Sequence, residues 1–189
     1  MAEFMLHPLS PLGGIESRYR ELDFAEVSDQ DIVSIATPLG EQQSLFEAVM
    51  SAYHIELPSV GRWQRSSVDN ACFLGTAPNQ YFIMSDHSKF SAENKITDKL
   101  GETIHVADQS DSWVVIKIGG PKSRASLERV CAIDLDPDFF PAGNVARTLL
   151  DHIGTIIMAE GNDQFLLLSA RSSANSFCKT LQRSIENVL

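Results

Sequence analysis

Side chains with catalytic or metal-binding chemistry are few in this chain and widely separated. Its histidines are His7, His54, His87, His105 and His152. None has a second ligand residue at a spacing such as His-x-x-x-His, which is typical of zinc sites on helices. The run Ser85-Asp86-His87-Ser88 contains the three residue types of a nucleophilic triad, but triad members meet in space from separate elements. We therefore predict that Ser85, Asp86 or Ser88 accepts backbone N–H groups where a strand passes into a helix.

Two further motifs resemble ligand loops but lack the residues on which those loops depend. Gly119-Gly120-Pro121 follows a strand-like run, without the Gly-x-Gly-x-x-Gly spacing or the Gly-Lys-Ser/Thr lysine of phosphate loops. Asp134, Asp136 and Asp138 alternate as in a calcium loop, but its sixth-position Gly and twelfth-position Glu are missing. We predict a strand-to-helix turn and an Asp-Pro turn, respectively. The sequence thus predicts no catalytic, cofactor-binding or metal-binding residues, and no FAD or NAD on this chain.

The pair Phe139-Phe140, followed by Pro141, is the candidate site for contact with another protein. Two adjacent large aromatic side chains in a loop cannot easily both point inward. An exposed one would be a typical anchor of a protein interface. The alternative is a loop folded over the core, and the sequence leaves both possibilities open. Phe139, Phe140 and Pro141 are therefore the predicted partner-interface residues.

The composition is that of an acidic protein with enough apolar residues for a full core. Of the 189 residues, 43% are hydrophobic, and the formal net charge is −10. The 15 basic residues are scattered, whereas nucleic-acid binding depends on clustered Lys and Arg. No stretch approaches the roughly 20 apolar residues that span a bilayer. We expect no nucleic-acid or membrane partner, and a solvated acidic surface rather than a docking face for a basic partner.

The cysteines and the N-terminus indicate a reducing, cytoplasmic location. Cys72, Cys131 and Cys178 are odd in number and far apart, which favours neither a disulfide framework nor a Cys-x-x-Cys metal site. We expect reduced core residues. The N-terminus has no basic region before Arg18, and Pro8 and Pro11 interrupt any apolar segment of the kind found in signal peptides.

Periodicity predicts the elements that must position these residues. Residues 1–30 show no sustained period and are expected to form an extended arm. The expected elements of the following half, 31–110, are a strand at 31–37, a helix through 45–53, a hairpin of 71–76 and 81–85 around Pro78-Asn79, a helix at 88–100 capped by Ser88 or Ser91 and stopped by Gly101, and a strand at 103–107.

The second half, 111–189, interleaves strands and helices again. The nearly continuous β-branched run at 113–118 predicts a central strand. Further expected elements are a helix from Pro121 to Cys131, strands at 145–150, 155–159 and 165–169, and a last helix whose apolar stripe runs from Ala174 to Val188. The pattern predicts an α+β fold for residues 31–189, with antiparallel sheets packed against helices.

Several of these segments, in their order and spacing, resemble a known family. The loop Cys-Ala-Ile-Asp-Leu-Asp-Pro-Asp-Phe-Phe-Pro-Ala-Gly at 131–143 is similar to the Cys-x-x-Asp-Leu-x-Pro-x-x-Phe-Pro-x-Gly segment of the gamma subunit of heterotetrameric sarcosine oxidase. Residues 108–128 resemble a strand, Gly-Pro turn and helix that this family shares with folate-dependent aminomethyltransferases such as the glycine-cleavage T-protein. Residues 165–177 look like the family's closing strand and helix. The resemblance extends from about Ala71 to the C-terminus.

This resemblance implies a fold and a function. The fold would be two ferredoxin-like halves similar to the first two domains of aminomethyltransferases, without their third barrel domain. The chain would be a structural, noncatalytic subunit that contacts the alpha, beta and delta subunits, mainly the large alpha subunit. The complex would oxidatively demethylate sarcosine with FAD, FMN and NAD on its other subunits, and pass the one-carbon unit to tetrahydrofolate.

Two alternatives remain open at this point. The chain could be a stand-alone folate-binding or one-carbon-transfer protein, although none of Asp69, Asp86 and Asp108 can be assigned by motif to the acidic role that such enzymes need. It could also be a solitary interaction module. An isolated chain with an uncovered interface could self-associate. A large apolar patch would favour a missing partner, whereas a deep pocket with polar groups would favour a ligand.

Overall fold

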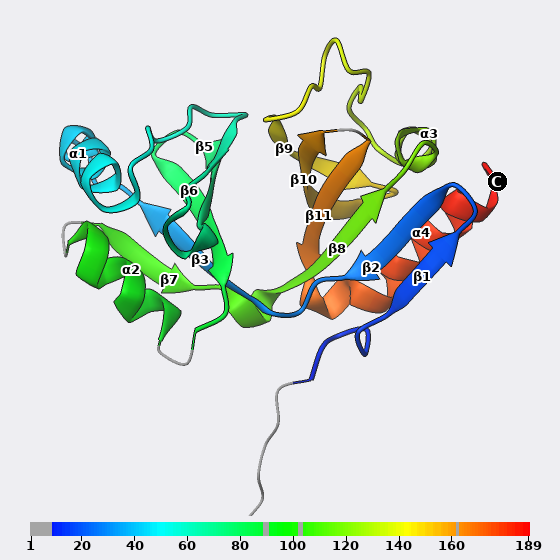
Figure 1. Cartoon of the computed structure of the whole chain (residues 1–189), viewed down its shortest axis with the longest axis horizontal. Helices are drawn as coiled ribbons and strands as arrows, with labels where there is room; N and C mark the ends of the chain where they lie inside the picture. The colour runs from blue at the N-terminus through cyan, green and yellow to red at the C-terminus, as the bar shows by residue number, and fades with distance from the viewer. Residues whose placement is uncertain (1–8, 89–90, 102–103, 162) are drawn as a thin grey trace, which may run out of the picture.

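The chain folds into two antiparallel sheets that face each other, with helices on the two outer sides (Figure 1). The computed structural model describes residues 9–88, 91–101, 104–161 and 163–189. All strand pairings within it are antiparallel. The predicted α+β fold, with antiparallel sheets packed against helices, is thus confirmed.

The five-stranded sheet has the order β4-β5-β6-β3-β7. Its strands are β3 (Gln30–Ala36), β4 (Trp63–Arg65), β5 (Cys72–Ala77), β6 (Gln80–Asp86) and β7 (His105–Asp108). The predicted hairpin is confirmed, since β5 and β6 pair around Pro78-Asn79 and Asn79 has a left-handed φ of 58°. The first residue of the predicted strand at 103–107 lies outside the described residues, and the strand that the structure shows there, β7, begins at His105. The short strand β4 was not among the expected elements.

The six-stranded sheet has the order β1-β2-β8-β11-β10-β9. Its strands are β1 (Glu16–Tyr19), β2 (Leu22–Glu26), β8 (Trp113–Gly119), β9 (Val145–Leu150), β10 (Ile153–Gly161) and β11 (Gln164–Ala170). The apolar run expected to form a central strand does so, because β8 pairs with β2 on one side and β11 on the other. Successive side chains of β8 are buried on opposite faces of the sheet, Val114 and Ile116 in the outer cluster and Val115 in the cluster between the sheets.

The helices cover the outer faces of the two sheets. They are α1 (Gln42–Tyr53), α2 (Ala92–Leu100), α3 (Ser123–Glu128) and α4 (Ala174–Glu186). Ser91, one of two predicted caps of α2, accepts a hydrogen bond from the backbone N–H of Asn94, and Gly101 ends the helix with a φ of 88°. The third helix is shorter than expected, because Cys131 leaves it for an isolated β-bridge with Leu150. Among the described residues, no helix is long and apolar enough to cross a membrane.

Three apolar clusters among the described residues hold these layers together. One joins the outer face of the five-stranded sheet to α1 and α2, and another joins the outer face of the six-stranded sheet to α3 and α4. The third fills the space between the sheets. Its fully buried members include Leu74, Met158 and Leu168. The alternation of inward and outward side chains along each strand therefore supplies both the outer and inner cores.

The segment expected to be an extended arm differs in structure from that expectation. Residues 16–26 form the β1–β2 hairpin, and β2 pairs with β8, so this hairpin extends the six-stranded sheet of the other half. Leu22 and Phe24 are buried in the core of that half. The sequence of β1 is mostly polar, and the pairing of β2 with β8 joins the hairpin to the sheet.

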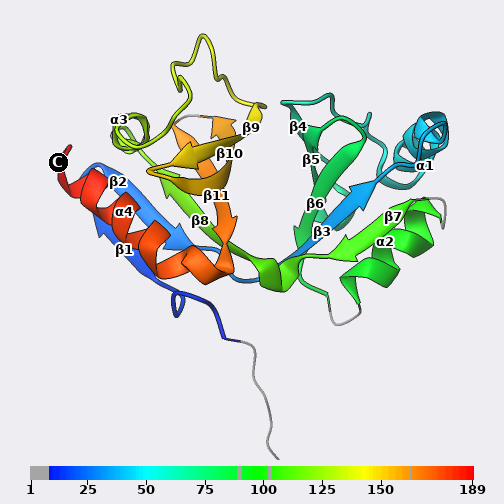
Figure 2. The ribbon, with the colours of Figure 1, turned by 180° about the vertical axis from the view of Figure 1, so that it is seen from behind.

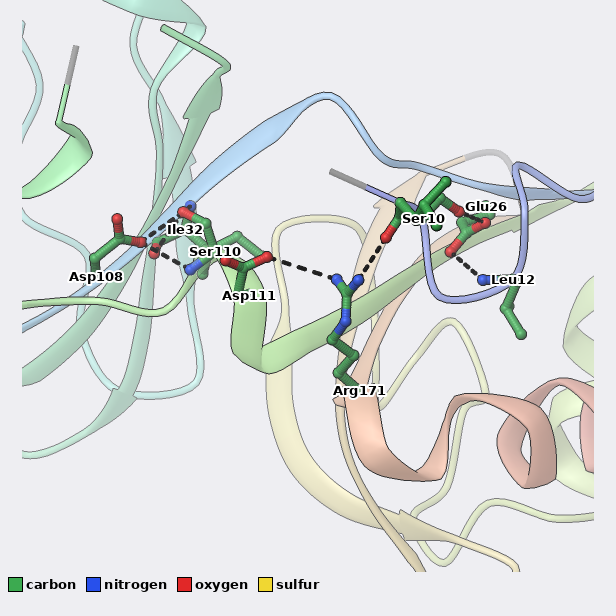
Figure 3. Close-up of polar contacts among 9 residues, drawn as sticks. Ser10, Leu12, Glu26, Ile32, Asp108, Ser110, Asp111 and Arg171 are labelled. Carbon is green, nitrogen blue, oxygen red and sulfur yellow. Dashed lines mark hydrogen bonds and ion pairs between the residues drawn. The ribbon is translucent and has the colours of Figure 1, made fainter. Parts of the chain in front are cut away.

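Polar contacts hold the point at which the chain crosses between the halves (Figure 3). The Glu26 carboxylate accepts hydrogen bonds from the Ser10 hydroxyl and from the backbone N–H of Leu12, the latter at 3.1 Å. The Arg171 guanidinium donates to the backbone carbonyl of Leu9 and lies 3.7 Å from an Asp111 carboxylate oxygen. The described end of the N-terminal segment is therefore attached to the body of the protein.

Candidate functional site

The Ser85–Ser88 run does not form a catalytic triad. Asp86 accepts a hydrogen bond from the Asn70 side chain, and Ser85 lies opposite Asp31 on the neighbouring strand. The buried Asp31 carboxylate accepts the backbone N–H of Ser88 at 3.0 Å and lies 2.7 Å from Nδ1 of His87. Asp31 thus joins the run from a strand far away in the sequence, and it caps the turn after β6. No motif in the sequence links Asp31 to this run, because the two lie 56 positions apart.

The Gly119-Gly120-Pro121 motif forms the predicted turn and offers no phosphate cradle. The backbone N–H of Gly120 donates to the carbonyl of Asp163 at 3.1 Å, and that of Lys122 donates to the carbonyl of Glu21 at 3.4 Å. Gly120 has a φ of 115°, and a Cβ at this position would lie 2.6 Å from the Glu21 carbonyl oxygen. Glycine is needed here for close backbone contact, and the N–H groups already have acceptors.

The aspartates of the 134–138 segment build a turn, as predicted. Asp134 accepts the backbone N–H of Asp136 through its side chain, and Asp136 accepts that of Asp138, each at 2.9 Å. These are the Asx turns that Asp favours. Among the described residues, no group of three or more His, Cys, Asp or Glu side chains could hold a metal ion.

This turn separates the two phenylalanines. Both backbone N–H groups, of Phe139 and Phe140, donate to the Asp136 carbonyl, at 2.9 and 2.7 Å. Phe140 is 6% exposed and packs in the outer core with Leu135, whereas Phe139 is 72% exposed. The sequence left open whether this loop exposes an aromatic side chain or folds over the core. Phe139 is the exposed side chain, and Phe140 packs over the core. A large aromatic side chain stands in solvent on a loop anchored on both sides by buried side chains.

The loop that carries Phe139 also contacts the five-stranded sheet. Edge strands β4 and β9 approach each other where the sheets meet (Figure 2). The backbone N–H of Val145 donates to the Gly61 carbonyl, and that of Trp63 donates to the Gly143 carbonyl, both at 3.0 Å. The indole Nε1 of Trp63 donates to the Ala159 carbonyl at 2.9 Å. The loop that carries Phe139 is therefore fixed to both halves.

A small pocket lies beside the same loop, with Arg124 in its wall. The pocket has a volume of about 270 Å³, and its apolar lining includes Pro137, Pro141 and Phe165. Nε of Arg124 donates to Oδ1 of Asp163 at 3.1 Å, and the guanidinium carbon lies 5.0 Å from the centre of the Phe165 ring. In the sequence, Arg124 was one of many scattered basic residues.

A larger cavity, of about 480 Å³, opens between the two sheets. Its charged groups pair with one another. Glu160 accepts Arg65 and Lys117 on its two carboxylate oxygens, each at 3.2 Å. Because these residues come from both sheets, the network ties the halves together in a partly solvated space. Burial raises the pKa of the Cys72 thiol in this cavity to about 12, so this cysteine stays protonated and unreactive.

Comparison with known proteins identifies relatives of this arrangement. A chain of the heterotetrameric sarcosine oxidase from Corynebacterium sp. U-96, in complex with pyrrole 2-carboxylate, is similar in structure with a TM-score of 0.77 and 20% identity, over 91% of this chain and 87% of that chain. The glycine cleavage system aminomethyltransferase T from Bartonella henselae matches with a TM-score of 0.63 and 14% identity, over 85% of this chain and 45% of that chain. These likenesses show a shared fold.

Sequence comparison assigns the family. Among curated proteins, none shows significant sequence similarity to the chain. The family model described as "Sarcosine oxidase, gamma subunit family" matches residues 41–186, which extends the resemblance upstream of Ala71. The matched region includes the aromatic loop, the Arg124 pocket and both sheets except β1, β2 and β3. The chain belongs to the sarcosine oxidase gamma subunit family.

Proposed function

We propose that this chain is the gamma subunit of a heterotetrameric sarcosine oxidase complex, in which it is structural and noncatalytic. The observation that carries the proposal is the family match over residues 41–186. In this proposal the complex is cytoplasmic and contains alpha, beta and delta subunits. It oxidatively demethylates sarcosine and transfers the one-carbon unit to tetrahydrofolate. FAD, FMN, NAD and tetrahydrofolate bind to the other subunits.

The state of the acidic side chains supports a noncatalytic role. The Asp69 carboxylate lies 3.4 Å from Nζ of Lys95 and is hydrogen-bonded to Lys99, which holds its pKa below the ordinary value. Asp108 accepts the backbone N–H of Ser110 at 2.9 Å. These carboxylates already have local structural partners, so they are poorly suited to take a proton from a substrate.

In the same proposal, the loop carrying Phe139, Phe140 and Pro141 contacts the large alpha subunit. Phe139 supplies the anchor, since its side chain is 72% exposed on a loop that is already ordered. Ordering the loop in advance lowers the entropic cost of binding. Phe140 and Leu135 hold the loop from below, and Phe140 therefore contributes indirectly.

Reconstitution tests this function. The other three subunits would be produced with and without this chain, and assembly and sarcosine-dependent peroxide formation would be measured. We expect a complete complex only when the chain is present. A His87→Gln variant, which alters the Asp31–His87 pair, should assemble and turn over sarcosine like the unchanged chain. Loss of turnover in an intact complex of this variant would contradict the noncatalytic role. A lone chain that binds tetrahydrofolate would instead support a stand-alone one-carbon protein.

A further inference from the structure

Arg124 is an under-bonded cation in an apolar surrounding. Its side chain is 19% exposed, and its only hydrogen bond among the described residues runs from Nε to Asp163. Nη1 is shielded from solvent and has no hydrogen-bond acceptor. The ring face of Phe165 covers one side of the guanidinium. A guanidinium has five N–H donors, and a buried donor left without an acceptor is costly, the more so on a charged group.

The pocket beside Arg124 limits what can supply the missing acceptor. Besides Arg124, its polar lining residues are Asp163 and Gln164. The rest of the wall comes from two proline residues, two alanine residues, a glycine and Phe165, which offer shape and apolar contact. A volume of about 270 Å³ admits one side chain rather than an extended segment. A fitting group would have an apolar stem and an oxygen tip. A carboxylate suits a guanidinium best, because charge-assisted hydrogen bonds are the stronger ones.

The position of the pocket indicates where this carboxylate comes from. Pro137 and Pro141 line the pocket and also bracket the exposed Phe139 on the same loop. A protein surface that covers this loop would therefore contact both Phe139 and the pocket walls at Pro137 and Pro141. Hot spots on one side of an interface tend to pair with those on the other.

We propose that the Arg124 pocket receives an Asp or Glu side chain of the partner subunit, whose carboxylate binds the guanidinium beside the Phe139 anchor. The two surfaces then interlock in both directions: Phe139 enters the partner, and a partner carboxylate enters this chain. Asp163 is 42% exposed and accepts a hydrogen bond only from Nε of Arg124. Because Nη1 is shielded from solvent, the incoming carboxylate would meet the guanidinium at Nη2. The inference rests on the proposed function, because it needs a partner subunit.

Two substitutions at the same ion pair give the test. Arg124→Gln removes the receptor, and we expect the dissociation constant for the other subunits to rise about tenfold or more. Asp163→Asn keeps an oxygen for Nε and fits the left-handed φ of 55° at this position, but removes the negative charge that competes with the incoming carboxylate. We expect this variant to bind about two- to tenfold more tightly.

The two variants are expected to change the dissociation constant in opposite directions, and this distinguishes a binding role of Arg124 from a purely structural ion pair. Both variants break the same Arg124–Asp163 pair, so a purely structural role predicts changes in the same direction, or none, and either result would overturn the inference. Arg129→Gln is the matched control, since Arg129 is exposed at the end of the same helix and lies outside the pocket. Unfolding curves of each isolated variant would show that the chain is folded.

Two further outcomes show whether the proposed function or only this inference is wrong. If the unchanged chain does not associate with the other subunits, the proposed function fails, and this inference fails with it. If it associates and the two variants do not differ in sign, only the inference fails. Sodium acetate tests for a free small acid in the pocket. If acetate raised the melting temperature of the unchanged isolated chain but not that of Arg124→Gln, the pocket would belong to a small molecule, which would overturn the partner assignment.

Discussion

Phe139→Ala and Phe140→Ala remove the same side chain from neighbouring positions, and we expect them to affect different properties. Phe140 is 6% exposed and belongs to the outer core, so its truncation should lower the free energy of unfolding by about 3 to 5 kcal/mol. Phe139 is 72% exposed, and its truncation should change the free energy of unfolding by less than about 0.5 kcal/mol. The effect of Phe139→Ala should be on subunit association instead.

The magnitude of that effect follows from the exposed area. An aromatic side chain contributes about 200 Å² when it is fully buried, so the 72% exposed fraction of Phe139 corresponds to about 140 Å² that a partner can cover. At about 25 cal/mol per Å², this area contributes up to about 3.5 kcal/mol. Interface anchors cost upward of about 2 kcal/mol when truncated. We therefore expect the dissociation constant to rise roughly 30- to 400-fold.

Urea denaturation of each isolated variant and titration against the other subunits measure the two quantities. Leu39→Ala is the control, because Leu39 is 93% exposed in the turn before α1 and lies outside the aromatic loop. It should change neither quantity appreciably. Unchanged binding of Phe139→Ala would refute the interface, and a large loss of its stability would refute the placement of its side chain in solvent.

Three further predictions concern the fold itself. Gly120→Ala should destabilise the chain by at least about 1 to 3 kcal/mol in urea denaturation, because it combines a φ of 115° with a Cβ 2.6 Å from the Glu21 carbonyl oxygen; an unchanged midpoint would contradict that contact. Cys72, whose pKa burial raises to about 12, should resist iodoacetamide at pH 8 in the folded chain and react in urea, as followed by mass spectrometry; rapid labelling of the folded chain would contradict its burial. Lys99 holds the pKa of Asp69 below the ordinary carboxyl value, so Asp69 stabilises the fold above that value and loses this effect as the pH falls through the lowered pKa. Asp69→Asn should therefore be less stable than the unchanged chain at pH 7, and this difference should vanish in strong acid; a pH-independent difference would contradict the ion pair.

Elements with a strong apolar period could be predicted from the sequence. The 113–119 strand is nearly continuous in β-branched and apolar residues because both of its faces are buried, one against helices and one between the sheets. The 72–86 hairpin was predictable because Pro78-Asn79 has the turn chemistry that its geometry needs. The last helix followed from the apolar stripe between Ala174 and Val188, of which Phe177, Leu181 and Ile185 are buried.

Features that depend on distant segments could not be predicted. The 16–26 hairpin is joined to the sheet through the pairing of β2 with β8, and the sequence of β1 is too polar to indicate a strand pair. Asp31 meets His87 across 56 positions of sequence, and Arg124 meets Asp163 across 39. The sequence could identify Phe139 and Phe140 as interface candidates, but not which of them faces solvent. That choice depends on the Asx turns and on the space that the core leaves for Phe140.

The most direct test of the central claim is purification of the tagged chain from native lysate, with identification of the copurifying chains and an absorbance scan for flavin. We predict three further subunits in constant proportion, flavin absorbance, and peroxide formation that depends on sarcosine. A colourless chain that purifies alone under the same conditions would contradict the assignment as a subunit of this complex.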